Sequence, residues 1–574
     1  MRRVLRFAFL GTFAASLLAP SCARDEDTRV AIVTKLTAPR ALLTRATKLE
    51  LRVLEGGTVA CDDTKGLVSN ETGAREIAKQ DLGDTGCAAN VRFCGNVSVE
   101  KSDALRVFAA TAKDASSATL AVGCASAKVE QDTLPLAIQM FRYLEPAVCG
   151  DGTVQPTEQC EPPGTPLCDD GCQSNEILLS LGSAQNNTDT GGPNDKTDPS
   201  FLWPSGTGNG GRFLAFFTDK QTGANNNTDV GIRAMADDLS ALASPPALAK
   251  GSIFLSNGTG FPPQAAPLRQ SMPQAAFLGG KYWVVFQDDN SPSSFGLDIH
   301  LRSLDDVLQS DQGVDPLVVN GSTGEAGIQA SPSIAAGKTR LLIAWEDSGA
   351  GKIVGRTLTP PASFGSQNDI STGNANAQPS VATTSSGFVT VWKSGTGIRF
   401  RALNEDGTPQ GTDAAVSEGG SDFDRPRVAS LADGRFAVAW SAGGDVFVQR
   451  FDAKGAKIAG DQDRPINDQL VDGDQVGAVI AATPAAGGSY VVAWLDKASG
   501  HVRARFLGGS SGFLFNNVNG QSTEFQASRV EGRSRTNPAV AVGGAGPFVA
   551  IGWEDTGAAP NAGLLARRFP LPSE

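Results

Sequence analysis

The sequence predicts an all-β protein, and three observations support this prediction. The chain of 574 residues contains 66 glycines and 32 prolines, which is typical of a chain with many turns. Its apolar residues alternate, or form runs of five or six, between turns rich in Gly, Asn, Asp and Ser, which is the pattern of strands. In addition, one short pattern returns seven times between residues 198 and 569.

Each return begins with a proline or small residue and continues with an apolar run that ends in an aromatic residue. A turn and a second run containing arginine follow, and a further short run precedes most of the prolines, so each unit carries about four strands. Units of this length predict a seven-bladed β-propeller over residues 175–570, since tandem sandwiches would need roughly 100 residues each. The aromatic residues that mark the units are Phe217, Phe286, Trp345, Trp392, Trp440, Trp494 and Trp553.

The two ends of the repeat region predict how a ring of sheets would close. Residues 177–181 resemble the fourth strand of a unit but precede the first unit, whereas the last unit ends at residue 569 without a fourth strand. We therefore expect residues 177–181 to pair beside residues 565–569, which would remove an exposed sheet edge.

Two charged positions also recur in the repeat. Because functional residues seldom repeat in every unit, we expect a cross-strand Asp–Arg pair in each unit rather than a ring of ligand contacts. The aspartates, two residues after the aromatic, are Asp219, Asp288, Asp347, Asp496 and Asp555. The arginines of the next run are Arg233, Arg302, Arg356, Arg401, Arg450, Arg505 and Arg568.

Residues 1–22 have the features of a targeting segment. Three arginines precede an apolar stretch, residues 7–19, that is too short to span a membrane. The following Leu18-Ala-Pro-Ser-Cys22 resembles the bacterial lipoprotein signal, which implies that Cys22 is acylated and becomes the mature N-terminus. The alternative is ordinary cleavage after Ala23. Lipidation of Cys22 leaves eight of the nine cysteines, an even number suited to disulfides in an oxidising compartment.

Charge and hydropathy limit the partners of the chain. The formal net charge is −12 and there is no basic cluster, so nucleic acid is not an expected partner. No second apolar run of about 20 residues exists, so membrane contact is expected only through the lipid anchor. We therefore expect an exported lipoprotein of the outer membrane, the cell surface or the periplasm. The sequence does not predict an oligomeric state.

Residues 25–146 predict a β-sandwich-like domain. Three segments alternate with the period of two that half-buried strands show, at residues 49–53, 105–109 and 134–140. Cys61, Cys87, Cys94 and Cys124 allow three disulfide pairings, and zinc is not expected because they have no Cys-x-x-Cys spacing.

Residues 147–173 predict a small disulfide-rich module, because four cysteines in so short a segment cannot build an apolar core. The cysteines are Cys149, Cys160, Cys168 and Cys172. Cys149-Gly-Asp-Gly152, Glu158 and the closing Cys168-Asp-Asp-Gly-Cys172 resemble the Myxococcus cysteine-rich repeat, a module of exported and surface proteins of myxobacteria. The resemblance covers about 24 residues and implies an exported protein with two disulfides.

The sequence shows no catalytic motif. Neither of its two histidines lies in a triad or metalloprotease pattern, and no glycine-rich phosphate loop is present. The sequence predicts no cofactor, and calcium is the alternative because two loops are rich in oxygen ligands. Neither loop has EF-hand spacing, and solvated hairpin tips are the default interpretation. The weak calcium candidates are Asp219, Asp229, Asp288, Asp289 and Asp298.

The favoured hypothesis is a surface-anchored binding protein whose repeat region contacts an envelope polysaccharide or protein. One alternative is a hydrolase or lyase that acts on polysaccharide through Asp or Glu side chains, since acidic residues are abundant. The other alternative is a structural component of the envelope. Enzymatic activity is not the favoured hypothesis, because no catalytic residue stands out.

Overall fold

The computed structural model is all-β, which confirms the predicted class: the described residues contain no helix, and therefore none that could span a membrane. They form two compact units, Met1–Leu144 and Glu145–Glu574. The described residues are 29–37, 46–62, 66–82, 93, 97–115, 117, 119–131, 133–142, 168, 173–179, 196–204, 212–220, 228–236, 239, 253–254, 269–289, 297–305, 317–321, 327–373, 376–395, 397–418, 422–459, 465–467, 473–483, 488–509, 524–530, 532–543, 548–556 and 563–571.

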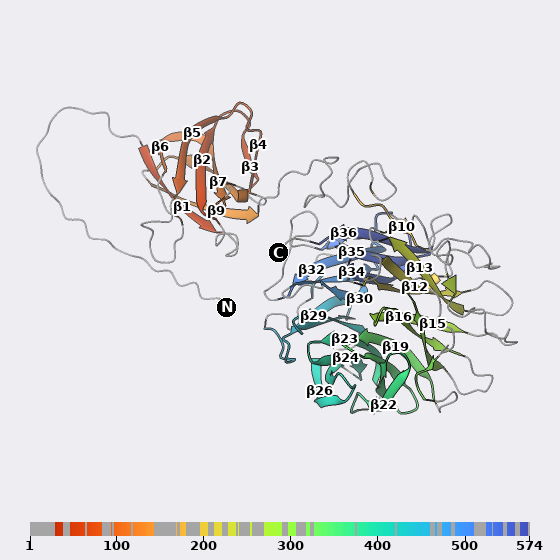
Figure 1. Cartoon of the computed structure of the whole chain (residues 1–574). Helices are drawn as coiled ribbons and strands as arrows, with labels where there is room; N and C mark the ends of the chain where they lie inside the picture. The colour runs from red at the N-terminus through yellow and green to blue at the C-terminus, as the bar shows by residue number, and fades with distance from the viewer. Residues whose placement is uncertain are drawn as a thin grey trace, which may run out of the picture. The chain divides into compact units, whose positions relative to one another are not determined.

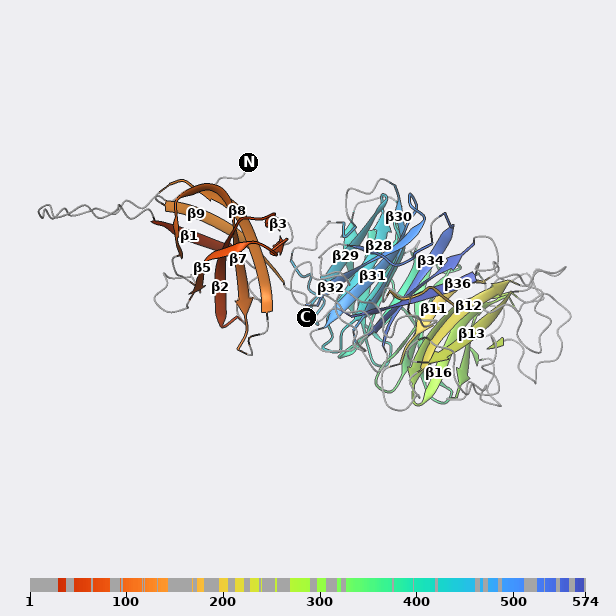
Figure 2. The same ribbon diagram turned by 90° about the horizontal axis from the view of Figure 1, so that it is seen from above.

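The first unit contains one seven-stranded sheet in the order β5-β2-β7-β8-β9-β1-β6 and a two-stranded β3–β4 hairpin. Figure 2 shows β2, β7, β8 and β9 side by side in this sheet. β1 and β9 are parallel and the other pairs are antiparallel. The strands are β1 (Arg29–Thr37), β2 (Lys48–Glu55), β3 (Ala60–Asp62), β4 (Leu67–Ser69), β5 (Arg75–Leu82), β6 (Val97–Glu100), β7 (Ser102–Lys113), β8 (Thr119–Val129) and β9 (Thr133–Arg142).

The expected pair of stacked sheets is therefore wrong for the described strands, because a single sheet curls until its edge strands β5 and β6 come into contact. Its inner face holds one apolar cluster that includes Leu49, Leu51 and Val53, as the alternation predicted. In β7 the inward residues are Phe108 and Ala110, and not Val107, because β7 is buried on both faces and Val107 packs in a second cluster with Leu54 and Cys124.

Val107 faces the opposite side of the sheet, where the β3–β4 hairpin lies. A disulfide between Cys61 of β3 and Cys124 of β8 joins this hairpin to the sheet. Cys168 of the second unit is also disulfide-bonded. The other predicted disulfide cysteines, and the lipid-attachment candidate Cys22, lie outside the described residues: Cys87, Cys94, Cys149, Cys160 and Cys172.

The second unit consists of seven antiparallel sheets (Figure 1). Within the described residues, six of these sheets have four strands and the fifth has three. The first sheet is β11 (Lys196–Leu202), β12 (Arg212–Lys220), β13 (Thr228–Ala236) and β14 (Ile253–Phe254), and the second is β15 (Gln270–Leu278), β16 (Lys281–Asp288), β17 (Asp298–Leu304) and β18 (Leu317–Val318). The third sheet is β19 (Gln329–Ala336), β20 (Leu341–Asp347), β21 (Lys352–Thr359) and β22 (Ser363–Asp369), and the fourth is β23 (Asn376–Thr384), β24 (Gly387–Ser394), β25 (Gly397–Asn404) and β26 (Pro409–Glu418). The fifth sheet is β27 (Asp424–Ser430), β28 (Phe436–Ala442) and β29 (Asp445–Phe451), and the sixth is β30 (Gln475–Ala482), β31 (Ser489–Asp496), β32 (His501–Gly508) and β33 (Phe525–Gln526). The seventh sheet is β34 (Arg535–Gly543), β35 (Phe548–Asp555), β36 (Gly563–Pro570) and β10 (Ile177–Leu178).

These seven sheets form a closed ring. The first strand of each sheet contacts the first strand of the next, and β34 of the seventh sheet contacts β11 of the first. β10 pairs antiparallel with β36, with Ile177 opposite Ala566, so the strand from before the first unit completes the last sheet. The predicted closure of the ring is thereby confirmed.

The seven repeat aromatics are buried on the second strand of each sheet, with relative exposures of 0–4%. Trp345 shows how they act, because it packs in a cluster that combines the second and third sheets. The interpretation of these residues as packing residues is confirmed. Apolar contact between neighbouring sheets therefore supplies the core that one small sheet cannot form alone.

The expected Asp–Arg pairs are wrong. Lys196 of β11 forms a buried ion pair with Asp219, and Gln270 of β15 donates to Asp288 at 2.9 Å, so these two aspartates pair with the innermost strand. Asp496 does form an ion pair with an arginine of the next strand, but with Arg503 at 3.0 Å and not with Arg505. In five sheets the recurring arginine lies opposite the residue two positions before the aromatic, as Arg356 lies opposite Ile343, whereas Arg450 lies opposite Ala437, three positions before Trp440. In those five sheets the arginine is thus four residues, about 13 Å, from the aspartate position along the hairpin.

Several of the arginines instead connect neighbouring sheets. Arg356 donates to the carbonyl of Val319 at 3.0 Å and Arg401 donates to Ile370 at 2.9 Å, each carbonyl directly following the last strand of the preceding sheet. Arg505 and Arg567 make the same bond, to Ile466 and Ala527. In the seventh sheet the recurring position is therefore Arg567 and not Arg568.

Candidate functional site

The innermost strand of every sheet in the ring contains a bulge at the same place, where its register with the second strand shifts. Each bulge contains one residue with a left-handed backbone, with φ between 28° and 66°, and six of the seven precede a proline. These residues, called the bulge residues below, are Asp198, Met272, Ser331, Gln378, Arg425, Gly477 and Asn537.

A left-handed backbone costs a non-glycine residue roughly 1–2 kcal/mol, so the surrounding structure has to hold it in place. At several contacts between neighbouring sheets, a side chain of the preceding sheet holds the bulge residue by accepting a hydrogen bond from its backbone N–H. Thr218 accepts from Met272 at 3.1 Å, and Gln287 accepts from Ser331 at 3.2 Å. Both acceptors directly follow the repeat aromatic.

The same arrangement closes the ring. Glu554 follows Trp553 and accepts from the N–H of Asp198 at 2.6 Å. Its carboxyl also accepts from Thr536 and from Asn537 Nδ2, at 2.5 and 2.8 Å. Burial, the largest effect, raises the pKa of Glu554, and these hydrogen bonds offset only part of that shift. The backbone of five bulge residues, Asp198, Met272, Ser331, Gln378 and Arg425, is thus fixed from the neighbouring sheet.

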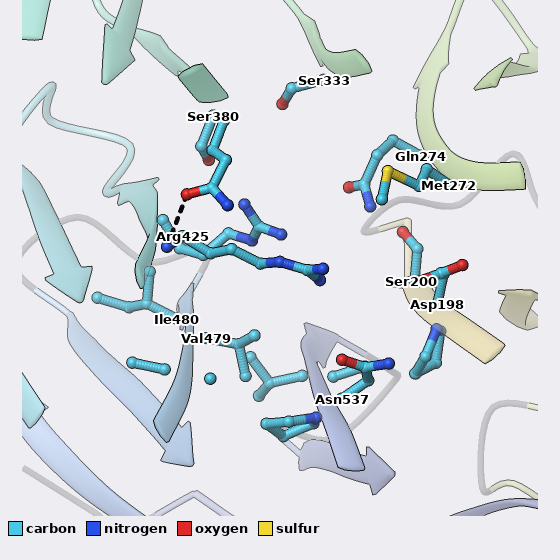
Figure 3. A pocket seen from close by; sticks show the side chains of 18 of the residues that line it. Asp198, Ser200, Met272, Gln274, Ser333, Ser380, Arg425, Val479, Ile480 and Asn537 are labelled. Atoms are coloured by element: carbon cyan, nitrogen blue, oxygen red, sulfur yellow. Dashed lines mark hydrogen bonds between the residues drawn. The ribbon is translucent and has the colours of Figure 1, made fainter. Parts of the chain in front are cut away.

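The bulges surround a central cavity of about 540 Å³. All seven innermost strands contribute to its lining, and every bulge residue is part of it. Figure 3 shows labelled bulge residues from four of the sheets, Asp198, Met272, Arg425 and Asn537, around this space. A cavity of this size lies within the range of small-molecule binding sites.

The two sides of the cavity differ in charge. Asp198 of the first sheet lies on one side, where the hydroxyls of Thr197 and Thr218 donate to its carboxylate at 3.2 and 3.1 Å. Arg425 lies on the other side (Figure 3) and its neighbour Arg427 lines the same cavity. A ligand in the cavity would therefore meet an acidic side and a basic side.

The two arginines lack partners among the described residues, since neither guanidinium has a described hydrogen bond or ion pair. Enclosure by protein, and then the charge of Arg425, lower the pKa of Arg427 to about 10, while Asp424 acts in the opposite direction. Lys497 at the cavity differs from them, because its ammonium lies 3.4 Å from the carboxylate of Asp474.

The calcium candidates do not gather at this site. Asp219 pairs with Lys196, Asp288 accepts from Gln270, and Asp298 accepts from Asn320 at 2.9 Å. Asp289 is half-buried at the end of β16, and the side chain of Asp229 lies outside the described residues. Within the described ranges, no group of three or more His, Cys, Asp or Glu side chains is placed to hold a metal ion.

Sequence reasoning missed the bulge residues and the arginine pair. It identified the repeat proline but not the residue before it, whose type differs in every sheet. The sequence did contain a signal for these residues. An alignment of the seven copies shows a position that changes in every copy and lies beside positions that repeat.

No family model matches the chain, and no curated protein matches it. Several solved structures show distant likenesses to the chain. The chain aligns with a GH43 endo-arabinanase from Bacillus licheniformis at 16% identity and a TM-score of 0.29, covering 47% of this chain and 99% of that one.

It also aligns with an α-L-arabinanase of Penicillium chrysogenum at 12% identity and a TM-score of 0.39, covering 69% and 97%. The NanB sialidase of Streptococcus pneumoniae aligns at 9% identity and a TM-score of 0.37, covering 92% and 96%. All three TM-scores lie below 0.5, so the site has to be interpreted from its own residues.

Proposed function

We propose that the seven sheets form a seven-bladed β-propeller whose central cavity binds a saccharide, in an exported protein anchored to the cell surface through Cys22. The observation that carries this proposal is the variety of the bulge residues. The packing positions repeat around the ring, whereas the seven bulge residues that line the cavity are all of different types. Such a lining suits one asymmetric ligand.

The polarity of the cavity supports a saccharide rather than an apolar ligand. Ser333 and Ser380 each accept a backbone N–H of the next sheet, from Val381 at 3.0 Å and Val428 at 3.2 Å. Each hydroxyl keeps its own proton to donate. Together with Gln274 they give the wall several fixed polar groups, which sugar hydroxyls require for oriented binding.

The binding experiment uses the chain from residue 23 onward and measures heats of binding to a panel of neutral and acidic oligosaccharides. Gly477 is the one bulge residue without a side chain, and an added Cβ would meet Pro538 at an ordinary 3.4 Å. We expect Gly477→Met to narrow the cavity and weaken binding at least tenfold. Met272 occupies the equivalent place in the second sheet, which shows that the bulge accommodates this side chain.

Gly443→Met is the matched control. Gly443 has a similar φ of 58°, against 66° at Gly477, but lies in a hairpin turn with nothing within 4 Å of an added Cβ. Both variants should lose roughly 1–2 kcal/mol of stability, whereas only Gly477→Met should lose binding. Unchanged affinity in Gly477→Met, or no saccharide bound by the wild-type chain, would refute the proposal.

A polysaccharide hydrolase is the second candidate, and one observation favours it. Asp198 lines the cavity beside Glu554, and the raised pKa of Glu554 is a property of general acids. The release of reducing ends from any panel member, abolished by Asp198→Asn, would establish turnover. Binding without turnover would leave the binding function as the better description.

The anchoring part of the proposal has a separate test. We expect a tagged full-length chain to incorporate labelled palmitate and to fractionate with membranes, and Cys22→Ser to lose both properties. Membrane association of Cys22→Ser without label would contradict lipidation at this residue.

A further inference from the structure

The basic side of the cavity contains two arginines on one strand. Arg425 and Arg427 flank Pro426 at the bulge of β27, and both line the cavity. Their charges have the same sign and oppose each other, and the protein around Arg427 removes part of the water from its guanidinium. This arrangement is unfavourable while no anion is bound, because a desolvated charge needs a partner.

The arginines are held on a fixed backbone. Gln378 of the fourth sheet accepts the N–H of Arg425 at 3.1 Å, the contact marked in Figure 3. Ser380 of the same sheet accepts the N–H of Val428, directly after Arg427, at 3.2 Å. The strand that bears both guanidinium groups is therefore fixed from the adjacent sheet on both sides of Pro426, which is the preorganisation that an anion site requires.

The carboxylates nearby leave this side positive. Asp424 precedes Arg425 on the same strand and has no described ion pair with either arginine. Asp198 lies on the opposite side of the cavity (Figure 3). Two arginines and one aspartate give this side a formal charge of about +1, which matches one carboxylate better than a doubly charged phosphate. The planar guanidinium fork also fits a carboxylate geometrically.

We infer that Arg425 and Arg427 form a subsite for the carboxylate of an acidic sugar. The hydroxyls of that sugar would then face the polar residues around Asp198, Gln274 and Asn537 on the other side. This inference rests on the proposed function, since it specifies the ligand class of the same cavity. It goes beyond that function because it states where the acidic group binds and which residues select it.

The test uses two acidic oligosaccharides, oligogalacturonate and oligoguluronate. Each is compared with its carboxyl-reduced form, in which every carboxylate becomes a primary alcohol. A sulfated oligosaccharide forms a third arm. Heats of binding are measured for the wild-type chain and for Arg425→Gln, Arg427→Gln and Lys454→Gln. Lys454 is an exposed turn residue of the same sheet, so its variant makes the same charge change away from the cavity.

We expect the wild-type chain to prefer the acidic forms at least tenfold. Each arginine variant should remove most of that preference, so that its affinities for the acidic and the reduced forms become similar, while Lys454→Gln should match wild type. Arg427→Gln without ligand should melt at or above the wild-type temperature, because it removes a desolvated charge. A structural arginine would give the opposite shift.

Each of the other outcomes refutes a defined part of the inference or of the proposed function. Equal affinity for acidic and reduced forms refutes the subsite while the proposed saccharide binding stands. Equal loss of both affinities in the arginine variants refutes the selective role of the two residues. A preference for the sulfated saccharide alone refutes the assignment to carboxylate. Binding of none of the saccharides refutes both the subsite and the proposed function.

Discussion

Arg567 provides the sharpest test of how the sheets are joined. Its side chain is 2% exposed and donates through Nε to the carbonyl of Ser174 at 2.9 Å and through Nη1 to the carbonyl of Ala527. One bond reaches the preceding sheet, and the other reaches the segment just before β10, the strand that closes the ring. We therefore expect Arg567→Met to weaken two connections at once.

The size of the effect follows from these contacts. A hydrogen bond to a charged donor contributes about 1.5–3 kcal/mol, and its loss leaves a buried carbonyl without that donor. The guanidinium also lies 4.9 Å from the centre of the Phe569 ring, although methionine replaces part of that contact. Arg567→Met should therefore lower the free energy of unfolding of the second unit by about 3–5 kcal/mol. Denaturant unfolding followed by tryptophan fluorescence measures this change.

Arg568 supplies the matched control. It is the next residue and undergoes the same substitution, but it is only half-buried and its guanidinium lies 4.3 Å from the centre of the Phe548 ring. Arg568→Met should cost about 1 kcal/mol. Equal losses in the two variants would refute the reasoning, because the connection between sheets would then not depend on which arginine reaches the carbonyls.

Three further predictions concern other parts of the chain. Replacing Cys61 and Cys124 by alanine should lower the stability of the first unit by about 4 kcal/mol, since the disulfide joins residues 63 positions apart, and denaturant unfolding of that unit measures the loss. Asp219→Asn should cost about 3 kcal/mol in the second unit by leaving Lys196 buried without its anion, whereas a neutral result would show that the pair is not required. Glu554 has a folded-state pKa raised above 4.5, so its stabilising contribution is complete below pH 4.5 and is lost as the pH rises through the raised value. Wild type should therefore lose stability relative to Glu554→Gln over that range, and a constant difference across it would contradict the raised pKa.

Much of the second unit could be predicted from the sequence, because the same kind of apolar packing recurs at each contact between neighbouring sheets. Buried aromatic residues such as Trp345 repeat, and the closing strand at Ile177 has the apolar pattern of a fourth strand. The pairing of charged residues could not be predicted in this way, because it depends on register. An offset of one residue made Arg568 resemble the recurring arginine, although Arg567 holds that position.

The candidate site could not be predicted from the repeat, because a repeat identifies what is shared. The bulge residues share a backbone conformation and not a residue type. The only sequence feature that accompanies this conformation is the following proline, and the sixth sheet lacks it, because Ala478 follows Gly477. The arginine pair could not be identified for a similar reason. The sequence does not show that residue 425 faces a cavity, nor that the neighbouring Asp424 forms no ion pair with it.

The variety of the bulge residues could also arise if these side chains had no role, and the backbone distinguishes the two explanations. Six of the seven positions place a non-glycine residue in the left-handed region, at roughly 1 kcal/mol or more each relative to glycine. Positions without a role would be expected to carry glycine, asparagine or aspartate, which adopt this conformation most readily. Gly477, Asn537 and Asp198 do so, whereas Gln378 and Arg425 place long polar or charged side chains at the cavity despite the strain. A strained residue type whose side chain faces a cavity is more simply explained by what the side chain binds than by the fold that holds it.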